Sequence, residues 1–404
     1  MTPAGENVGK FVLLYPPCRN VELIKDVGQI PHYLALRHGY HCEIVCLHSS
    51  LEYPFLADEA AGIRLRFLGS AKRVFTVNLS AIGYLLKNAS NVGVLQLYHI
   101  SVESAIYALL FRFLNPKALL YVKADLDVRS FSTYRSLQLP ANSLVRVLTT
   151  VSRRLFQWTM VPMLLDACTF ISVETSAAHS LLTTRFPRVA HKITLLPSGV
   201  SDWVADQVAL LPATDRDKTI LTVGRIGAPE KNHEMLVRAM ERITSPDWTC
   251  RFVGPVDPAF SRWVEARMVS NPTLREKVIL SGPIDDRRQL YQVYSLSSIF
   301  CLTSLRESFG LAMVEAAYFG NVIVSTRVPA AVDLTGNGRA GVLVDFDDDR
   351  SLASALSGLI ASPRRRIELS SETTRIARSS YSWSSIVDKL HSMLYPTGLS
   401  RSGS

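Results

Sequence analysis

The sequence predicts an α/β protein made of two Rossmann-like, doubly wound domains. Three observations predict this class. Short apolar runs of strand length alternate with helix-length segments, the alternation starts afresh after residue 217, and a polar, Asp-rich stretch separates the two series. With 404 residues, 48% hydrophobic and 20% charged, the chain is long enough to bury two cores.

The first series of apolar runs extends to about residue 200. Each run is bounded by polar or turn-forming residues, as is typical of buried parallel strands. Strands are expected within residues 10–17, 42–48, 64–69, 92–100, 118–126, 167–175 and 192–200. Helices are expected at about 23–37 and 102–114.

The second series repeats the pattern. Strands are expected within residues 219–227, 248–256, 277–284, 298–304, 321–326 and 340–344. Helices are expected within 233–243, 288–297, 310–320 and 350–361, and an amphipathic helix within 381–395. The predicted divisions are residues 1–197, 198–378 and a C-terminal crossover helix with tail, 379–404. We expect the ligand in a cleft between the domains, because open parallel sheets bind ligands at the carboxyl ends of their strands.

Positive charge is concentrated in the first half of the chain. Residues 1–197 carry 20 Lys or Arg against 12 Asp or Glu, a balance of +8, whereas residues 198–404 carry 24 against 23. This predicts an anionic partner, such as a membrane surface or a phosphorylated acceptor, although a solvated basic surface without a partner would look the same. No sequence signature of an RNA-recognition or helix-turn-helix domain is present, so no nucleic-acid partner is expected.

One basic and apolar segment favours the membrane surface. In residues 143–165, "SLVRVLTTVSRRLFQWTMVPMLL", arginines interleave with Leu, Val, Phe and Trp. A helix on an anionic membrane has this composition, and so does a core-packed helix whose arginines reach solvent. We expect a cytoplasmic protein with peripheral membrane contact, since the sequence has neither a signal-peptide pattern nor an uncharged apolar span of 18 residues. The six dispersed cysteines predict buried, reduced thiols rather than a zinc site.

The stretch "TVGRIGAPEKNHEML" carries two candidate phosphate ligands. Arg225 follows a predicted strand, and Lys231 lies six residues later near the start of a helix, where free backbone amides favour anions. A planar cation and a point charge converging there would suit a diphosphate. Taken alone, the two side chains could equally be solvated loop cations.

A second strand–loop–helix unit, "CLTSLRESFGLAMVEAAYFG", carries two glutamates. Its helix is expected to begin near Phe309 or Gly310, and Gly310 would let a ligand approach the backbone. Glu307 then lies on the loop and can face a sugar. Glu315 lies roughly 8 Å deeper in the helix and can accept hydrogen bonds from a ribose. Glutamate is also an ordinary solvent-facing helix former, so the spacing of the two glutamates alone does not indicate a binding site.

These stretches together resemble the retaining GT-B glycosyltransferases of family 4. "ESFGLAMVEAAYFG" is similar to the E-x7-E signature of that family, and Arg225 with Lys231 is similar to its "VGR…K" element. "ITLLPSGV" looks like the interdomain segment, and "VILSGPIDDRRQLYQVYSLSSIFCLTS" looks like the segment that passes the nucleotide base. The resemblance is strong over residues 170–360 and weak over 1–160.

The resemblance implies a role for each matching residue. Arg225 and Lys231 would hold the donor diphosphate and stabilise the leaving group, Glu307 would contact the donor sugar, and Glu315 the ribose. Further donor contacts would come from Gly282, Pro283, Ile284, Ser308, Phe309, Gly310 and Leu311. A retaining enzyme that works by double displacement needs two carboxyl groups about 5 Å apart. Glu307 and Glu315 are expected to lie farther apart, so they are not expected to form such a pair.

The implied activity is metal-independent, retaining transfer of a hexosyl group from a nucleotide-diphosphate sugar to a glycan or lipid-linked acceptor, in polysaccharide or glycoconjugate biosynthesis. The first domain would bind the acceptor. No cofactor is implied beyond the donor, which is a substrate. Two alternatives stay open. One is a non-catalytic nucleotide-sugar-binding or scaffold subunit, and the other is a different GT-B activity, such as an epimerase or a phosphorylase.

The first half departs from the family pattern. "YPPCRNVEL" lacks the glycine pair that often follows the first strand, and "LLYVKADLD" has Lys123 and Asp125 where many members have a histidine. These two residues are candidate acceptor contacts, or they pair with each other. His99 is a third acceptor-side candidate, although a packed, hydrogen-bonded core histidine is the reading favoured there. The D-x-D pattern at Asp125–Asp127 imitates a metal motif of another fold, and no metal site is predicted.

Overall fold

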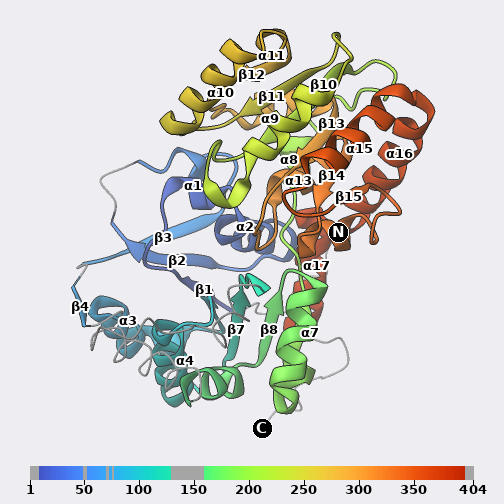
Figure 1. Ribbon diagram of the computed structural model, residues 1–404. Helices are drawn as coiled ribbons and strands as arrows, with labels where there is room; N and C mark the ends of the chain where they lie inside the picture. Colours follow the sequence, from blue (N-terminus) through green and yellow to red (C-terminus); the bar gives the residue numbers. More distant parts are fainter. Residues whose placement is uncertain (1–8, 49–51, 70–71, 75–76, 129–158, 396–404) are drawn as a thin grey trace, which may run out of the picture. The chain divides into compact units, whose positions relative to one another are not determined.

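The computed structural model describes residues 9–48, 52–69, 72–74, 77–128 and 159–395. The chain divides into two compact units, which we call unit 1 (Met1–Ser198 with Ile386–Ser404) and unit 2 (Gly199–Ser385). Each unit is a parallel α/β layer structure (Figure 1). Helix α17 (Trp383–Leu394) includes the boundary at which the chain passes from unit 2, ending at Ser385, back to unit 1, resuming at Ile386.

Within its described residues, unit 1 is built on a seven-stranded sheet in the order β3-β2-β1-β6-β7-β8-β9, and every neighbouring pair is parallel. The strands are β1 (Phe11–Leu14), β2 (Cys42–Leu47), β3 (Ile63–Leu68), β6 (Val94–Tyr98), β7 (Leu119–Ala124), β8 (Phe170–Val173) and β9 (Ile193–Leu195). Two short strands, β4 (Arg73–Val74) and β5 (Val77–Asn78), pair antiparallel outside this sheet. Six of the seven sheet strands lie within the runs predicted from sequence, and β3 begins one residue before its run, at Ile63.

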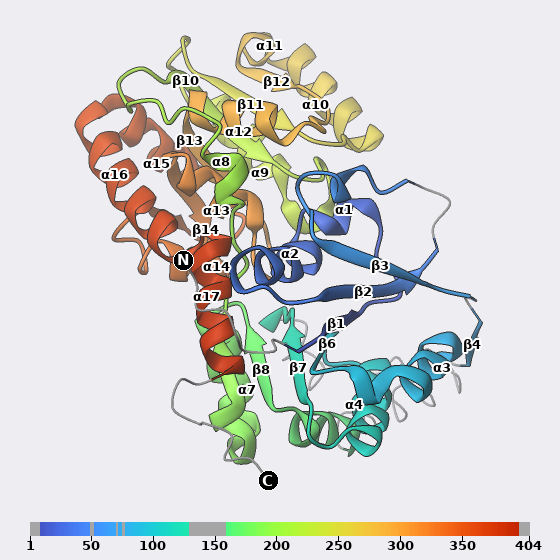
Figure 2. The ribbon, with the colours of Figure 1, turned by 180° about the vertical axis from the view of Figure 1, so that it is seen from behind.

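Helices cover both faces of this sheet (Figures 1 and 2). Helix α2 lies against one face, and α3 and α4 lie against the other. The core beneath α3 and α4 is made of alternate strand residues such as Val12, Leu95 and Leu97. The helices include α1 (Asn20–Leu23), α2 (Asp26–His38), α3 (Leu79–Asn88), α4 (Val102–Leu114) and α7 (Ser176–Arg185), with 3-10 turns η1 (Pro54–Leu56), η2 (Ala89–Asn91) and η3 (Pro187–Lys192). Residues 159–167 are also helical.

Within its described residues, unit 2 has a six-stranded parallel sheet in the order β12-β11-β10-β13-β14-β15. The strands are β10 (Asp217–Val223), β11 (Thr249–Val253), β12 (Val278–Leu280), β13 (Ser297–Leu302), β14 (Val322–Thr326) and β15 (Val342–Val344). The order reverses between β10 and β13, the point at which open parallel sheets bind ligands. The loops after these two strands are therefore the first place to look for a site.

Two separate cores cover the faces of this sheet. One contains residues of α8, α12, α13, α14 and α16, and the other contains residues of α9, α10, α11, α15 and α16. The helices are α8 (Asp202–Ala205), η4 (Pro229–Lys231), α9 (His233–Arg242), α10 (Pro258–Ser270), α11 (Leu274–Lys277), α12 (Arg287–Leu296), α13 (Leu311–Tyr318), α14 (Pro329–Leu334), α15 (Asp349–Ala361) and α16 (Pro363–Ser380).

Helix α16 was not predicted, because "PRRRIELSSETTRIARSS" is polar almost throughout. It begins with Pro363 at the first position, and the Ser362 side chain accepts a hydrogen bond from the Arg365 amide. All six cysteines are buried free thiols, as predicted. No helix in the described part of the chain is long and apolar enough to cross a membrane. Most of the basic segment 143–165 lies outside the described residues.

Candidate functional site

The loop after β10 is held in shape by glycines and one buried histidine. Gly227 has a φ of 86°, and a Cβ there would lie 2.4 Å from the Cβ of Phe260, so only glycine fits. The amide of Gly227 donates to Nδ1 of His233, 3.0 Å away, at the start of α9. Burial, with a smaller contribution from Lys231, lowers the pKa of His233 to about 4. The neutral ring can therefore act as the acceptor that fixes this loop.

The loop after β13 ends at Gly310, which precedes α13. Gly310 has a φ of 85°, a conformation that side chains rarely adopt, and it is the N-cap of the helix. Among the described residues no side chain caps this end, so its first amides are available to an anion. The helix begins at Leu311, one residue after the range expected from the sequence.

Two hydrogen bonds to backbone carbonyls join these two loops. The Leu305 amide donates to the carbonyl of Glu230 at 2.8 Å, and the Thr303 hydroxyl donates to the carbonyl of Lys231 at 3.0 Å. Strands β10 and β13 are neighbours, so both loops leave the same edge of the sheet. The sequence elements 225–231 and 304–315 therefore form one structural site.

Lys231 and Glu307 meet where the loops join. The Nζ atom of Lys231 lies 2.6 Å from Oε2 of Glu307, which also accepts a hydrogen bond from the Ser304 hydroxyl at 3.1 Å. Both charged side chains are mostly buried. The sequence suggested separate roles for these residues, and the structure adds that they are ion-paired with each other.

Arg225 lies at the open side of this site. Its side chain is 74% exposed, and its Nη2 atom lies 2.5 Å from Oε1 of Glu230. An exposed ion pair of this kind contributes about 0–1 kcal/mol, so the guanidinium is free to exchange Glu230 for another anion at little cost. Arg225 and Lys231 thus differ in environment, one exposed and the other largely enclosed.

Glu315 is buried more deeply than the sequence suggested. It is 4% exposed; its Oε1 accepts from Arg287 at 2.9 Å and its Oε2 from the Tyr294 hydroxyl at 3.0 Å. Burial and the Glu315 carboxylate raise the pKa of Tyr294 well above its ordinary value, so its hydroxyl stays a donor. Arg287 and Tyr294 were not singled out from sequence, because nothing local marks a contact across 28 residues.

The other donor-side candidates fall into two groups. Gly282, Pro283 and Ile284 follow β12, and the Gly282 carbonyl accepts from the amide of Gly254, 2.8 Å away in the loop after β11. Ser308, Phe309 and Leu311 flank Gly310 at the start of α13. The buried Phe309 ring packs against Tyr381, so it supports the turn from inside.

Lys123, an acceptor-side candidate, is fully buried at the end of β7. Its Nζ lies 2.9 Å from Oε1 of Glu174 and 3.6 Å from Oδ2 of Asp26, and Ser198 donates to the same Glu174 oxygen at 2.5 Å. Burial alone would lower the pKa of Lys123, but Glu174 and Asp26 outweigh it and hold that pKa above its ordinary value. Sequence reasoning missed both carboxylates, because they come from distant segments.

His99 and Asp125 are both exposed. The expectation of a packed core histidine at position 99 is wrong, because the backbone turns there: His99 has a φ of 63°, and its amide donates to the Lys123 carbonyl at 3.0 Å. This left-handed residue ends β6 and directs its side chain away from the core. Its acceptor-side role stays a prediction.

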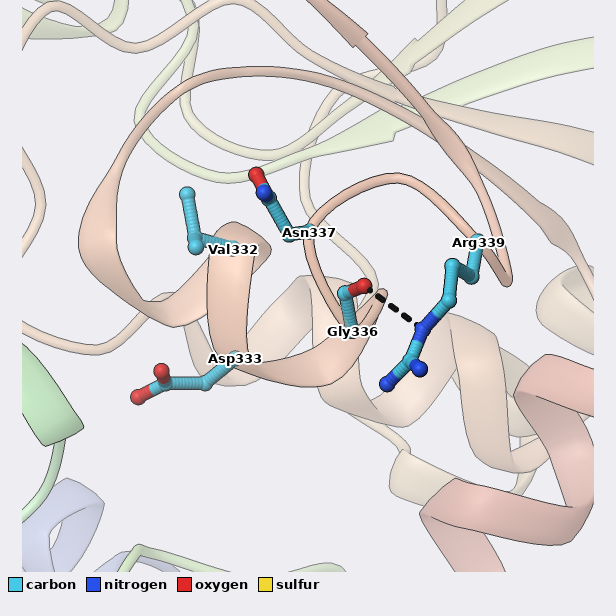
Figure 3. A pocket seen from close by; sticks show the side chains of 5 residues that line it. All are labelled: Val332, Asp333, Gly336, Asn337 and Arg339. Carbon is cyan, nitrogen blue, oxygen red and sulfur yellow. Dashed lines mark hydrogen bonds between the residues drawn. The ribbon is translucent and has the colours of Figure 1, made fainter.

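A shallow pocket of about 530 Å³ lies elsewhere in unit 2 (Figure 3). It is lined by Val332, Asp333, Gly336, Asn337 and Arg339, from α14 and the loop after it. None of the predicted site residues lines it. Across the described ranges, no group of three or more His, Cys, Asp or Glu side chains is arranged to hold a metal ion.

Comparisons with known proteins find similarity to glycosyltransferases. Residues 217–362, within unit 2, match the family model "Glycosyl transferases group 1". The chain is 30% identical over 188 residues to D-inositol 3-phosphate glycosyltransferase of Rhodococcus jostii, and 28% identical over 194 residues to phosphatidyl-myo-inositol mannosyltransferase of Mycolicibacterium smegmatis. These alignments cover 45% and 47% of this chain and 41% and 48% of the two relatives, so the chain matches less than half the length of each.

The similarity of fold extends over nearly the whole chain. The structure of HepE from Anabaena in complex with UDP matches with a TM-score of 0.67 at 14% identity, covering 95% of this chain and 99% of HepE. The two parallel α/β units therefore form a GT-B fold, as predicted.

Proposed function

We propose that the chain is a retaining glycosyltransferase that moves a hexosyl group from a nucleotide-diphosphate sugar to a glycan or lipid-linked acceptor. The observation that carries this proposal is the junction of two loops at the switch point of the unit 2 sheet. There Lys231, Glu307 and the uncapped start of α13 come together, with Arg225 at the open side. This arrangement offers cations and amides to a diphosphate and a carboxylate to a sugar.

The chemistry asks for positive charge at the leaving group. When the bond between C1 of the sugar and the diphosphate oxygen breaks, negative charge grows on the diphosphate and positive character on C1. Lys231, Arg225 and the first amides of α13 would stabilise the diphosphate. Because side chains and amides supply this charge, we expect transfer to continue in the presence of EDTA.

Retention follows if the acceptor attacks from the face that the diphosphate leaves. The acceptor oxygen bonds to C1, and its proton passes to the departing phosphate oxygen, so no enzyme carboxylate becomes covalently attached. Glu315 supports this route, because its oxygens are already engaged by Arg287 and Tyr294 inside unit 2. Glu307 would contact the sugar near the reacting centre.

The names of the relatives suggest classes of donor and acceptor. HepE was solved with UDP, and the two curated relatives are named for an inositol phosphate and a phosphatidylinositol. Among glycan and lipid-linked acceptors, we propose one that bears a phosphate, which the +8 balance of residues 1–197 favours.

A surface of unit 1 favours contact with an anionic membrane. On the packed helices α3 and α4, Leu86 and Phe113 are 60% and 84% exposed. Lys87, next to Leu86, and Lys117, four residues after Phe113, are also exposed. We expect binding to phosphatidylglycerol vesicles but not to phosphatidylcholine vesicles, and loss of sedimentation with vesicles in Phe113→Asp. Val269→Asp in unit 2, at another exposed apolar residue, should change nothing. Equal sedimentation of both variants would overturn the membrane proposal.

A thermal-shift screen tests the donor proposal first. Uridine, guanosine, thymidine and adenosine diphosphates are compared, and then the diphosphate sugars of the base that stabilises most. Transfer to a glycan or lipid-linked acceptor, with retained anomeric configuration by NMR, supports the glycosyltransferase. Sugar interconversion without an acceptor would indicate an epimerase, and binding without transfer or hydrolysis a scaffold subunit. Stabilisation by none of the diphosphates would contradict all three.

A further inference from the structure

Glu315 is held by two donors from a single helix. Arg287 is the first residue of α12 and Tyr294 lies seven positions later, two turns along the same face. One carboxylate oxygen accepts from Arg287 and the other from Tyr294, so the plane of the carboxylate is fixed. A buried glutamate that accepts hydrogen bonds from two fixed donors cannot rotate freely to meet a ligand.

The position of Arg287 is itself fixed. The carboxylate of Asp286 caps α12, accepting from the amides of Arg288 at 2.8 Å and Gln289 at 3.2 Å. The Arg287 guanidinium lies 5.0 Å from the centre of the Tyr291 ring, and Tyr291 and Tyr294 both pack against Phe319. Cation–π and aromatic contacts of this kind hold a side chain in one rotamer.

Arg287 also offsets the charge of Glu315. Both side chains are nearly buried, 8% and 6% exposed, and a carboxylate without a partner at that depth is strongly unfavourable. An ionised carboxylate has about four lone-pair sites, of which Arg287 and Tyr294 use two. The remaining sites keep a fixed direction, which suits recognition of neighbouring hydroxyl groups.

The capping residue Asp286 directly follows the segment Gly282–Asp285, the first part of which is assigned to the base of the donor. We infer that Arg287 is a positioning residue that, with Tyr294, orients Glu315 so that the site selects ribose over 2′-deoxyribose. The inference rests on the proposed function, since it takes Glu315 as the ribose ligand. It adds that ribose selectivity depends on a residue of α12 that does not itself need to touch the nucleotide.

Calorimetry with matched nucleotides tests this inference. The probes are whichever of UDP, GDP and ADP stabilises the chain most, and its 2′-deoxy form. The wild type should favour the ribonucleotide by about tenfold or more, the effect of one hydrogen bond to a charged group. In Arg287→Gln the preference should fall below about threefold, through weaker binding of the ribonucleotide. Arg287→Lys keeps the positive charge but lacks the planar guanidinium, so it should restore part of the ribonucleotide preference.

Two further variants keep the test decisive. Arg288→Gln removes an exposed arginine at the next position and should leave the preference unchanged. Tyr294→Phe keeps the ring but removes the second donor, and it carries the test if Arg287→Gln does not fold. A preference retained in folded Arg287→Gln or in folded Tyr294→Phe would overturn the inference, as would a wild type that binds both nucleotides equally. Binding of thymidine diphosphate alone would also overturn the inference, because its sugar is 2′-deoxyribose. Binding of none of the four diphosphates would instead overturn the proposed function itself.

Discussion

Lys231 and Glu307, 76 positions apart, form an ion pair of 2.6 Å that joins the loops after two neighbouring strands of unit 2. Each side chain compensates the charge of the other in a largely enclosed place. A diphosphate near Lys231 would have to compete with Glu307 for the same ammonium group. Changes at the two residues should therefore have opposite effects on nucleotide affinity.

Glu307→Ala should abolish turnover without weakening nucleoside-diphosphate binding. The substitution removes the carboxylate expected beside the sugar and releases Lys231 for the phosphate. We expect kcat to fall about 100-fold or more, while the Kd of the diphosphate stays equal or becomes lower. Steady-state kinetics and calorimetry measure the two quantities. The exposed Glu276→Ala is the control, and near-normal turnover in Glu307→Ala would remove Glu307 from the reacting centre.

Gly310→Ala should destabilise unit 2 and weaken diphosphate binding. Gly310 has a φ of 85°, and an added Cβ would lie 3.2 Å from Cγ of Glu307. The left-handed conformation alone costs a side-chain-bearing residue about 1–2 kcal/mol. Thermal unfolding should show a lower midpoint. In Gly358→Ala, inside helix α15 with nothing within 4 Å, the midpoint should hold or rise. Equal midpoints for both variants would contradict this account of Gly310.

His233 should make stability depend on pH. Its pKa is about 4 in the folded chain, below the ordinary value of 6.5, so the unfolded chain takes up the proton first as pH falls. The contribution of neutral His233 to the free energy of unfolding is complete above pH 6.5. It is lost as pH falls through 4, and the total loss is about 3 kcal/mol. His233→Gln should flatten the fall of the thermal midpoint between these values, whereas the exposed His41→Gln should not. The same slope in both variants would show that His233 is not the source.

The strands could be predicted because buried parallel strands are continuous apolar runs, such as Phe11–Leu14 and Val322–Thr326. The two loops that meet after β10 and β13 could be picked out because Arg225 with Lys231, and Glu307 with Glu315, are local in sequence; their donor-side role stays a prediction. Helix α16 escaped prediction because its apolar residues are sparse among arginines and serines.

The contacts that set the environment of each site residue could not be predicted. Lys123 is paired with Glu174 and Asp26, and Glu315 with Arg287, through contacts that exist only once distant segments pack together. His99 was misjudged because an apolar run before it does not reveal that the backbone turns to a positive φ.

Calorimetry of Lys231→Ala tests the central claim most directly, because Lys231, ion-paired with Glu307 where the two loops join, is the mostly buried cation proposed to meet the diphosphate. The probe is the nucleoside diphosphate that stabilises the wild type most. Losing a charged hydrogen bond and leaving Glu307 unpaired beside the phosphates should weaken binding by about 10- to 100-fold. Lys218→Ala, at an exposed lysine of β10 paired with Asp247, should bind like the wild type. Unchanged affinity in Lys231→Ala would contradict the assignment of this site to the donor diphosphate.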